Sequence, residues 1–219
     1  MVRIIVVDDH KLVRKCLCAR LDAVEEFEVI AEADSGEQVR ELTRTLEFDV
    51  LLMDLNMPGI GGLEAARRLL LSRPETRIIG ISMYVEGPFP AKFMELGGAG
   101  YVSKNADAQE MIHAIREVHA GRCYISHDVA QIIAANRVFR ASGMPFDALT
   151  PREIQVLHLI SEGQTVAEIA LALNVSRKTI AHHRRRLFEK FGVGNDVQLA
   201  LIARSQGFAE MGELMSVAD

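Results

Sequence analysis

Two kinds of hydrophobic pattern alternate along the first 120 residues of the chain. Short apolar runs bounded by polar residues are typical of strands buried on both faces, and apolar residues that recur every three or four positions are typical of amphipathic helices. Five runs of the first kind predict strands, at Arg3–His10, Phe27–Asp34, Val50–Met53, Thr76–Ser82 and Gly98–Lys104.

Each predicted strand is followed by a helical pattern. Ser35 and Gln38 have the spacing of a capping box, which starts the second helix. The remaining helices are predicted at Leu63–Leu71, from about Pro90 to Gly97, and at Ala106–Ala120. The apolar face predicted for the first helix consists of Leu12, Val13, Cys16, Leu17 and Leu21.

Strands that alternate with helices in this way form a parallel sheet through right-handed crossovers. We therefore expect an α/β domain with a doubly wound, five-stranded parallel sheet in strand order 2-1-3-4-5. That order places the carboxyl ends of strands one and three side by side, where open sheets bind their ligands. Asp54 ends the third strand, and Asn56 and Pro58 turn the chain directly after it. Asp54 is therefore predicted to point into this crevice.

The strand pattern stops after Gly121, and the rest of the chain is predicted to be helical. Thr150, Pro151 and Glu153 are a strong helix start, and that helix ends near Gly163. Two short helices, a tight turn and a long basic helix predict a helix-turn-helix. The other elements expected here are a short helix at Val129–Ala135, a linker at Phe139–Ala148, and helices at Thr165–Leu173, from a Ser176 cap to Phe191, and from an Asp196 cap to Gly207.

These boundaries predict four segments: an α/β domain at 1–122, a linker with a short helix at 123–148, a small all-α domain at 149–208, and a tail at 209–219. The formal net charge of −5 argues against a nucleic-acid binder, but the charge is uneven. Residues 1–120 carry 14 basic and 20 acidic side chains, whereas residues 148–208 carry 8 and 5. An acidic half joined to a basic half indicates two separate tasks.

Three cysteines without a paired framework are typical of a reducing cytosol. The chain has no apolar run near the ~20 residues needed to span a bilayer, and no secretion signal at its start. A cytoplasmic location is therefore expected.

Carboxylates are predicted to gather at the carboxyl edge of the sheet. Asp8 and Asp9 end the first strand and Asp54 the third. Mg²⁺ relieves such a concentration of negative charge, because it prefers oxygen ligands. Ser82 after strand four adds a hydroxyl and Lys104 after strand five a cation, which completes what a phosphoryl acceptor requires. Each residue also has an ordinary interpretation, since an Asp after a strand is usually a turn or helix cap.

Residues 3–120 resemble the receiver domain of two-component response regulators. The resemblance rests on Asp8, Asp9, Asp54, Ser82, Tyr101 and Lys104. It implies a CheY-like fold, phosphorylation of Asp54 by a sensor histidine kinase with Mg²⁺, and a switch in which Ser82 and Tyr101 turn inward. The implied metal ligands are Asp8, Asp9, Asp54 and the backbone carbonyl of Asn56. Asn105 departs from the proline that many receivers have after the lysine, and Tyr101 is equally compatible with a half-buried aromatic on an edge strand.

The helix from Ser176 to Gly192 is strongly basic opposite its apolar stripe. A basic helix after a tight turn fits the major groove, although a charge run is more often only a solvated face. The apolar stripe consists of Ile180, Leu187, Phe188 and Phe191, and the polar face of Arg177, Lys178, His182, His183, Arg184, Arg185 and Arg186.

Residues 149–208 resemble the four-helix LuxR/NarL-type DNA-binding domain. The matching residues include Leu149–Glu153, Glu168–Ala170, Val175 with Ser176, Lys178 with Thr179, and Asp196 with Val197. In that family the third helix reads DNA and the fourth pairs with a second copy. The resemblance makes Lys178, His182, His183 and Arg185 base or groove candidates, and Arg177, Arg184 and Arg186 phosphate contacts.

The segment Pro88–Pro90 and the run Arg186–Lys190 look most like the GacA/UvrY branch, whose members activate small regulatory RNA genes that control virulence and motility. The sequence thus predicts a phosphorylation-switched transcription regulator, active as a homodimer on promoter DNA, and not an enzyme. Two alternatives stay open: an Mg²⁺-dependent phosphohydrolase using Asp54, disfavoured because Asn56 stands where such enzymes place a second acid, and a DNA-binding protein insensitive to phosphate.

Overall fold

The structure is a computed structural model that describes residues 1–83, 85, 89–139 and 145–205. The chain divides into two compact units, one made of Met1–Val85 and Pro90–Arg140, the other of Glu86–Phe89 and Ala141–Asp219. Several predicted features lie outside the described residues: Pro88, residues 140–144 of the linker predicted at 139–148, the helix end at Gly207, and the tail at 209–219.

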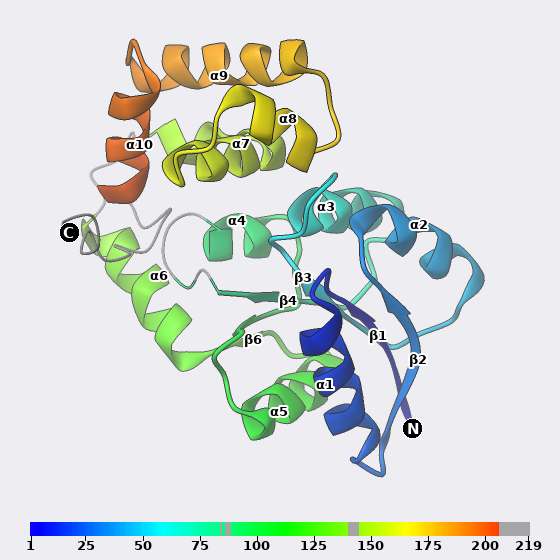
Figure 1. Cartoon of the computed structure of the whole chain (residues 1–219). Coiled ribbons are helices and arrows are strands. Elements are labelled where there is room, and N and C mark those ends of the chain that lie inside the picture. Colours follow the sequence, from blue (N-terminus) through cyan, green and yellow to red (C-terminus); the bar gives the residue numbers. More distant parts are fainter. Residues whose placement is uncertain (84, 86–88, 140–144, 206–219) are drawn as a thin grey trace, which may run out of the picture. The chain divides into compact units, whose positions relative to one another are not determined.

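The first unit is built on a parallel sheet in the order β2-β1-β3-β4-β5-β6 (Figure 1). The predicted order 2-1-3-4-5 is confirmed, with one strand added at the end. β3 is buried at every position, as the unbroken apolar run predicts. The strands are β1 (Val2–Val7), β2 (Phe27–Ala33), β3 (Val50–Asp54), β4 (Ile78–Ser82), β5 (Gly100–Ser103) and β6 (Tyr124–Ile125).

The sixth strand corrects the five-stranded prediction. β6 has only two residues, and it pairs in parallel with Gly100 and Tyr101 of β5. A two-residue strand is too short to produce a recognisable hydrophobic period. Because β6 covers β5, Tyr101 is not on an edge strand, and its side chain is fully buried.

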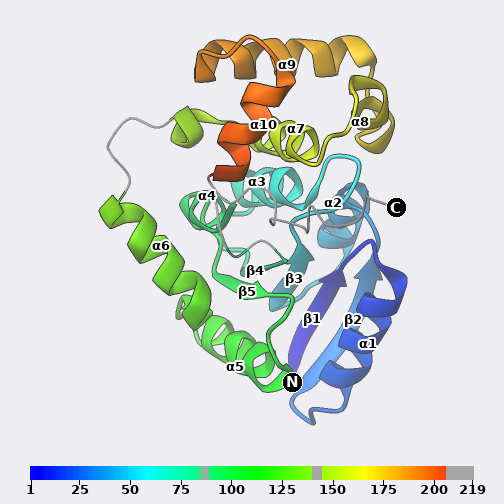
Figure 2. The same ribbon diagram turned by 60° about the vertical axis from the view of Figure 1, so that its left-hand side comes forward.

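Helices cover both faces of the sheet (Figure 2). α1 (Lys11–Asp22) and α5 (Ala108–His119) lie on one face, while α2 (Gly36–Thr45), α3 (Gly62–Ser72) and α4 (Phe89–Glu95) lie on the other. On the α1/α5 face, Ile112, Ile115 and Val118 pack against alternate side chains of the central strands. Burial of this kind contributes roughly 25 cal/mol per Å² of apolar surface, which is the main force holding the layers together.

The predicted apolar face of α1 is partly wrong. Leu12, Val13 and Cys16 are exposed, whereas Cys18 and Leu21 are buried. The helix is rotated because Arg14 turns toward the sheet, where it donates to Glu32 and to the backbone carbonyl of Asp8. Burial of the Cys18 thiol, together with the nearby Glu32 carboxylate, raises its pKa to about 11.

Two predicted helix caps are also wrong. The Ser35 side chain accepts no hydrogen bond from α2, and Gln38 instead accepts from the Asp34 amide at 3.2 Å. At the last helix, Asn195 caps by accepting from the Gln198 amide, while Asp196 faces Arg184. Asn and Asp both cap well, so composition alone did not separate these neighbours.

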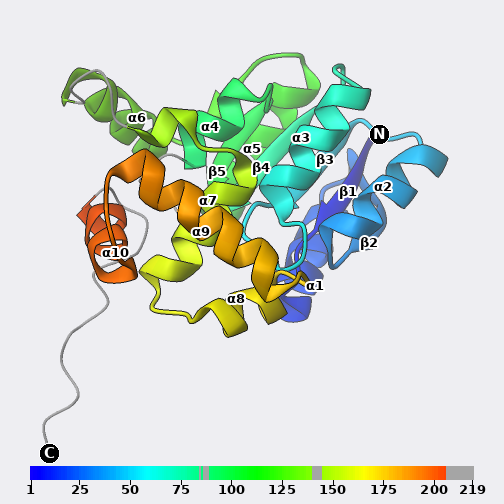
Figure 3. The same ribbon diagram turned by 90° about the horizontal axis from the view of Figure 1, so that it is seen from above.

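The second unit is a compact set of helices (Figure 3). Thr150 and Glu153 form the predicted capping box, and Ser176 caps the long helix as expected, accepting from the Thr179 amide at 3.1 Å. Asn174 turns the chain between the second and third helices with a positive φ. The helices are α7 (Pro151–Ser161), α8 (Val166–Ala172), α9 (Arg177–Phe191) and α10 (Asp196–Ser205), preceded by a short 3-10 turn at Pro145–Ala148.

The linker helix α6 spans His127–Phe139, which is longer than the predicted Val129–Ala135. In the part of the chain that the structure describes, no helix combines the length and apolar character needed to cross a membrane.

Candidate functional site

The side chains predicted to form the acidic site meet at the carboxyl ends of the parallel strands. Asp54 at the end of β3 and Asp8 after β1 are almost fully buried. Lys104, which follows β5, places its Nζ 2.7 Å from Asp54 Oδ2 and 2.8 Å from Asp8 Oδ2. Residues 50 positions apart in the chain thus form one buried ion-pair cluster.

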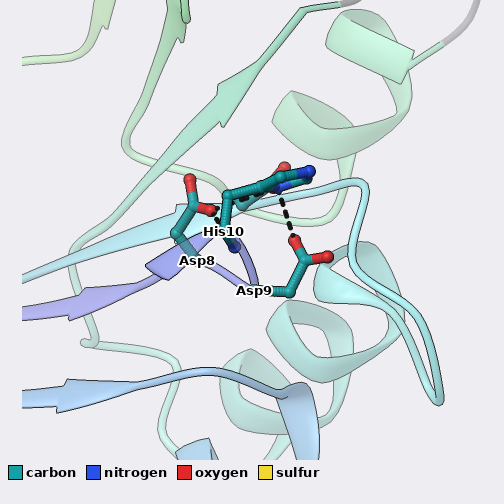
Figure 4. Close-up of side chains that lie close together, drawn as sticks. Asp8, Asp9 and His10 are labelled. Carbon is teal, nitrogen blue, oxygen red and sulfur yellow. Dashed lines mark hydrogen bonds and ion pairs between the residues drawn. The ribbon is translucent and has the colours of Figure 1, made fainter. Parts of the chain in front are cut away.

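A fourth side chain joins the carboxylates. One ligand atom from each of Asp8, Asp9, His10 and Asp54 lies within 4.8 Å of the others. Figure 4 shows His10 between the two neighbouring acids, with its Nδ1 3.1 Å from Asp9 and 3.5 Å from Asp8. His10 was not among the site residues predicted from the sequence, although its place directly after two strand-end acids was the available signal.

The electrostatics of the cluster are set by burial. Burial raises the pKa of Asp54, and the ion pair with Lys104 and the Asn56 amide offset this only in part. For Lys104, burial alone would lower the pKa, but Asp54 and Asp8 outweigh it and hold the pKa above its usual value. Three carboxylates, those of Asp8, Asp9 and Asp54, lie near a single lysine in this largely buried site. Oxygen donors with excess negative charge fit a hard divalent cation.

The β3–α3 loop fixes the direction of Asp54. The amide of Asn56 donates to Asp54 Oδ1 at 2.8 Å, and the amide of Ile60 donates to Glu37 on α2 at 3.1 Å. Gly62 begins α3 directly against β3: a Cβ at this position would lie 1.9 Å from the carbonyl oxygen of Asp54. Only glycine permits this approach.

Gly62→Ala is therefore expected to displace the backbone of Asp54. The contact is with backbone, which cannot rotate away, so we expect a loss of about 3 kcal/mol or more in the free energy of unfolding, measured by urea denaturation. Gly194→Ala is the control, because a Cβ there meets nothing closer than 4.0 Å. Equal stabilities for the two variants would contradict the packing.

Ser82 and Tyr101 form the second part of the site. Both are fully buried, and Ser82 Oγ lies 3.3 Å from Asn56 Oδ1. Burial raises the pKa of Tyr101, and a hydrogen bond with Ser82 partly offsets this rise. Phe93 packs edge-on against Tyr101 with ring centroids 6.1 Å apart. The tyrosine is thus connected to Asp54 through Ser82 and Asn56, and it already points inward.

The basic helix α9 packs on its own domain through Ile180 and Leu187, which are fully buried. Phe191 is only half-buried and packs against Phe146. The guanidinium of Arg184 lies over the ring of Phe188, 4.8 Å from the ring centroid. The predicted apolar stripe is therefore present, with its C-terminal half less deeply buried.

The structure divides the seven polar candidates on α9 into two groups. Arg184 pairs with Asp196, Arg186 with the buried Glu153, and His183 is half-buried with its Nδ1 shielded from solvent. Burial lowers the pKa of His183. The other four, all exposed, are Arg177, Lys178, His182 and Arg185, the last of which pairs only with an exposed glutamate one turn along the same helix.

Two family patterns match the chain. Residues 4–116 match the response regulator receiver domain, and residues 147–203 match the bacterial regulatory proteins of the luxR family. The chain belongs to the response regulators with a LuxR-type DNA-binding domain.

Relatives of this response regulator match over nearly its whole length. The chain is 43% identical to the response regulator GacA of Pseudomonas aeruginosa over 96% of its own length and 99% of that protein, and 41% identical to UvrY of Escherichia coli over 99% and 100%. The predicted resemblance to the GacA/UvrY branch is confirmed. It is also similar to RcsB of Salmonella enterica serovar Typhimurium, solved bound to a promoter with a phosphomimetic: the TM-score is 0.68 and identity 26%, covering 93% of this chain and 98% of that one.

Proposed function

We propose that Asp54 of this response regulator accepts a phosphoryl group from a sensor histidine kinase. The observation that carries the proposal is the buried triplet of Asp54, Asp8 and Lys104, with contacts of 2.7 and 2.8 Å. One Asp54 oxygen would bond to phosphorus as the bond to the donor breaks. Lys104 is placed to neutralise an oxygen of the transferred group, as phosphoryl transfer requires.

Magnesium is the proposed cofactor. Asp8, Asp9, Asp54 and the backbone carbonyl of Asn56 would hold it, and it would supply charge neutralisation at the phosphoryl oxygens. His10 lies beside these acids, and its exposed ring leaves it free to move aside.

Phosphorylation would act on the connected pair Ser82 and Tyr101. An aspartyl phosphate adds negative charge and strong hydrogen-bond acceptors beside the Ser82 hydroxyl. Ser82 would then leave Asn56 for the phosphoryl group, and the buried ring of Tyr101 would adjust with it. The rearranged face is proposed to promote a homodimer, and the dimer to bind promoter DNA.

The DNA-binding domain supports this proposal with two surfaces. On α9, Lys178, His182 and Arg185 lie at spacings of four and three and are exposed along one stripe, as a groove-facing helix needs. On α10, the exposed side chains of Val197 and Leu201 are four residues apart and form an apolar face suited to pairing with a second copy.

The two groups of basic residues on α9 predict different mutant behaviour. Arg185→Ala is expected to weaken DNA binding at unchanged stability and to reduce the slope of log affinity against log salt by about 1. Arg186→Ala is expected to lower the stability of the domain instead, because Arg186 faces Glu153. Fluorescence anisotropy across a salt series and thermal unfolding measure the two effects. A stability loss for Arg185→Ala would contradict this division.

The same proposal covers the remaining features of the chain. It assigns 1–122 to the receiver, 123–148 to a linker, 149–208 to the DNA-binding domain and 209–219 to a tail. It places the protein in the cytoplasm and makes Asp54 an acceptor and not a turnover nucleophile, since Asn56 offers no general acid. By analogy with its relatives, the regulated genes are proposed to include small regulatory RNA genes.

The function is tested by DNA affinity with and without phosphate. Genomic fragments captured by the phosphorylated protein supply the DNA. Acetyl phosphate with Mg²⁺ is expected to add one phosphoryl group, seen by intact mass, and to increase affinity for those fragments. Labelling without any change in affinity would favour the phosphate-insensitive alternative, and rapid repeated hydrolysis of acetyl phosphate would favour the phosphohydrolase.

A further inference from the structure

Arg14 lies in the first turn of α1, shortly after the acidic pair Asp8 and Asp9. Only 11% of its side-chain surface is exposed. Arginine is rarely buried unless it is paired, so the partners of this guanidinium are informative. Its Nη1 donates to the backbone carbonyl of Asp8, and its Nε donates to Glu32 Oε2 on β2 at 3.3 Å. One side chain thus joins the start of α1 to the end of β1 and to β2.

The turn between β1 and α1 carries two of the proposed metal ligands, Asp8 and Asp9. Asp8 is held at its amide, which donates to the carbonyl of Ala33 at 3.1 Å, and at its carboxylate, which accepts from the His10 amide at 2.7 Å. Arg14 holds the backbone carbonyl. That carbonyl belongs to the peptide unit that joins Asp8 to Asp9, so loss of Arg14 would release the peptide between the two acids.

The carboxylates themselves oppose this arrangement. One ligand atom from each of Asp8, Asp9 and Asp54 lies within 4.8 Å of the others, and like charges at such a distance repel each other. The start of α1 adds little resistance, because within the described residues its N-cap, His10, makes no side-chain hydrogen bond to the helix. The contact from Arg14 is therefore placed to keep the two neighbouring acids from turning apart before a metal ion binds.

Arg14 acts on this turn by contact more than by charge. Hydrogen bonds from Lys15 and Arg14 lower the pKa of Glu32, so that this carboxylate is ionised at neutral pH. Arg14 and Glu32 together then carry no net charge. Lys15 has the same charge as Arg14 and lies 2.7 Å from the same glutamate, but it makes no hydrogen bond or ion pair with the acidic turn in the part of the chain that the structure describes. The two basic neighbours therefore differ in their contact with Asp8.

We propose that Arg14 is a positioning residue for the metal site: it holds the peptide between Asp8 and Asp9 so that both carboxylates face Asp54 before Mg²⁺ binds. This inference rests on the proposed function, which places Mg²⁺ at these acids. Residues that orient metal ligands from behind contribute roughly 10–100-fold to metal affinity. Arginine suits this task because its planar fork donates to two acceptors at once, which a lysine ammonium on a flexible stem does not reproduce.

Mn²⁺ is the probe, because it takes the same oxygen ligands as Mg²⁺, and electron paramagnetic resonance of the free ion measures its binding to the full chain. Arg14→Met keeps an unbranched apolar stem and removes the fork, and it is expected to raise the Kd for Mn²⁺ about tenfold. Arg14→Lys keeps the charge and should also raise the Kd, because lysine cannot hold Asp8 and Glu32 together. Lys15→Met, the matched control, removes the same charge beside Glu32 and should leave the Kd unchanged.

Phosphorylation by acetyl phosphate across a series of Mg²⁺ concentrations, followed by intact mass, separates positioning from a loss of structure. For Arg14→Met the Mg²⁺ concentration that gives half the maximal rate is expected to rise about tenfold, in step with the Kd. The rate at saturating Mg²⁺ should stay close to that of the wild type, because Arg14 touches neither Asp54 nor the phosphoryl group. A purely structural role would lower the unfolding temperature without metal and leave both metal constants unchanged.

The outcomes distinguish this role from the proposed function. Wild-type Mn²⁺ affinity in both Arg14 variants would overturn the positioning role alone, and so would an equal loss of affinity in Lys15→Met, which would assign the effect to charge. If Arg14→Met does not fold, the Kd of Arg14→Lys decides between these outcomes. A wild-type protein that bound no Mn²⁺ and accepted no phosphoryl group would overturn the proposed function, and the role of Arg14 with it.

Discussion

Asp54→Asn is expected to abolish phosphorylation and, at the same time, to raise the unfolding temperature of the receiver domain at neutral pH. The first effect follows because an amide is no nucleophile for phosphorus. The second follows because the buried carboxylate has a pKa above its usual value, so its ionised form is destabilising in the folded state.

The sign can be checked by linkage. A carboxyl group whose pKa is raised by folding favours the folded state below the unfolded pKa, about 3.9 for Asp, and that contribution is lost as the pH rises. At pH 7 the wild type no longer has this contribution to stability. The Asp54→Asn variant carries a neutral amide, so its stability does not change with pH at this position. The stability difference should therefore shrink as the pH falls toward 4.

Thermal unfolding at pH 7 and at pH 5, with and without Mg²⁺, measures the effect. Mg²⁺ should stabilise the wild type more than Asp54→Asn, because a ligand stabilises in proportion to its affinity for the folded state. Asp49→Asn is the matched control: this carboxylate before β3 accepts from the Arg3 amide at 2.7 Å and faces the Arg3 guanidinium at 3.7 Å, so loss of its negative charge should destabilise slightly and should not stabilise. A lower unfolding temperature for Asp54→Asn would contradict this prediction. It would show that the ion pair between Asp54 and Lys104 stabilises the folded state by more than burial of the Asp54 carboxylate destabilises it.

Glu153→Ala is expected to cost the DNA-binding domain about 3–5 kcal/mol, the usual loss when one member of a buried ion pair is removed. The Glu153 side chain is fully buried and accepts from Lys190 Nζ at 2.7 Å and from the Thr150 amide at 2.8 Å. Arg186 adds a contact at 3.4 Å. One carboxylate thus fastens the C-terminal half of α9 to the start of α7.

The chain contains its own control for this prediction. Thr165 and Glu168 repeat the same capping box at α8, but Glu168 is exposed and its carboxylate contacts only the capping threonine among the residues that the structure describes. Glu168→Ala should therefore cause a much smaller loss. Chemical denaturation of the full chain, followed by helix content, measures both. Similar losses for the two variants would mean that capping, and not the buried pair, accounts for the effect.

The pH dependence of this contact has the opposite sign to that of Asp54. Burial alone would raise the pKa of Glu153, but Lys190 and Thr150 outweigh it and lower the pKa. The stabilisation is therefore present above the unfolded value of about 4.3 and is lost as the pH falls below it.

The features that the sequence predicted well are those with a long or repeated signal. Fully buried strands such as β3 and the strand-end acids have a pattern that only a parallel sheet explains, so the convergence of Asp8, Asp54 and Lys104 followed from topology. The helix start at Thr150 and Glu153 was equally clear. In contrast, β6 is too short to have a period, and its absence from the prediction led to the edge-strand interpretation of Tyr101.

The error on the face of α1 has a different cause. Arg14 is a long, charged side chain that sequence patterns assign to solvent, yet it turns toward the carboxylate of Glu32 on the neighbouring strand. A hydrophobicity pattern ignores such pairs because the partner lies far away in the chain. The resemblance to the LuxR-type domain makes Arg184 and Arg186 phosphate contacts, and this stays a prediction; the structure adds that each of them also pairs with a carboxylate of its own domain.

The internal pairing of Arg184, Arg186 and Lys190 has a consequence for how the protein searches a genome. Non-specific affinity for DNA grows with the number of cations that displace condensed counterions, and three of the six Lys and Arg side chains on α9 are already bound to acids on other helices of the domain. A monomer should therefore have a short residence time on DNA of random sequence. A dimer, which presents two recognition helices, should have a much longer residence time.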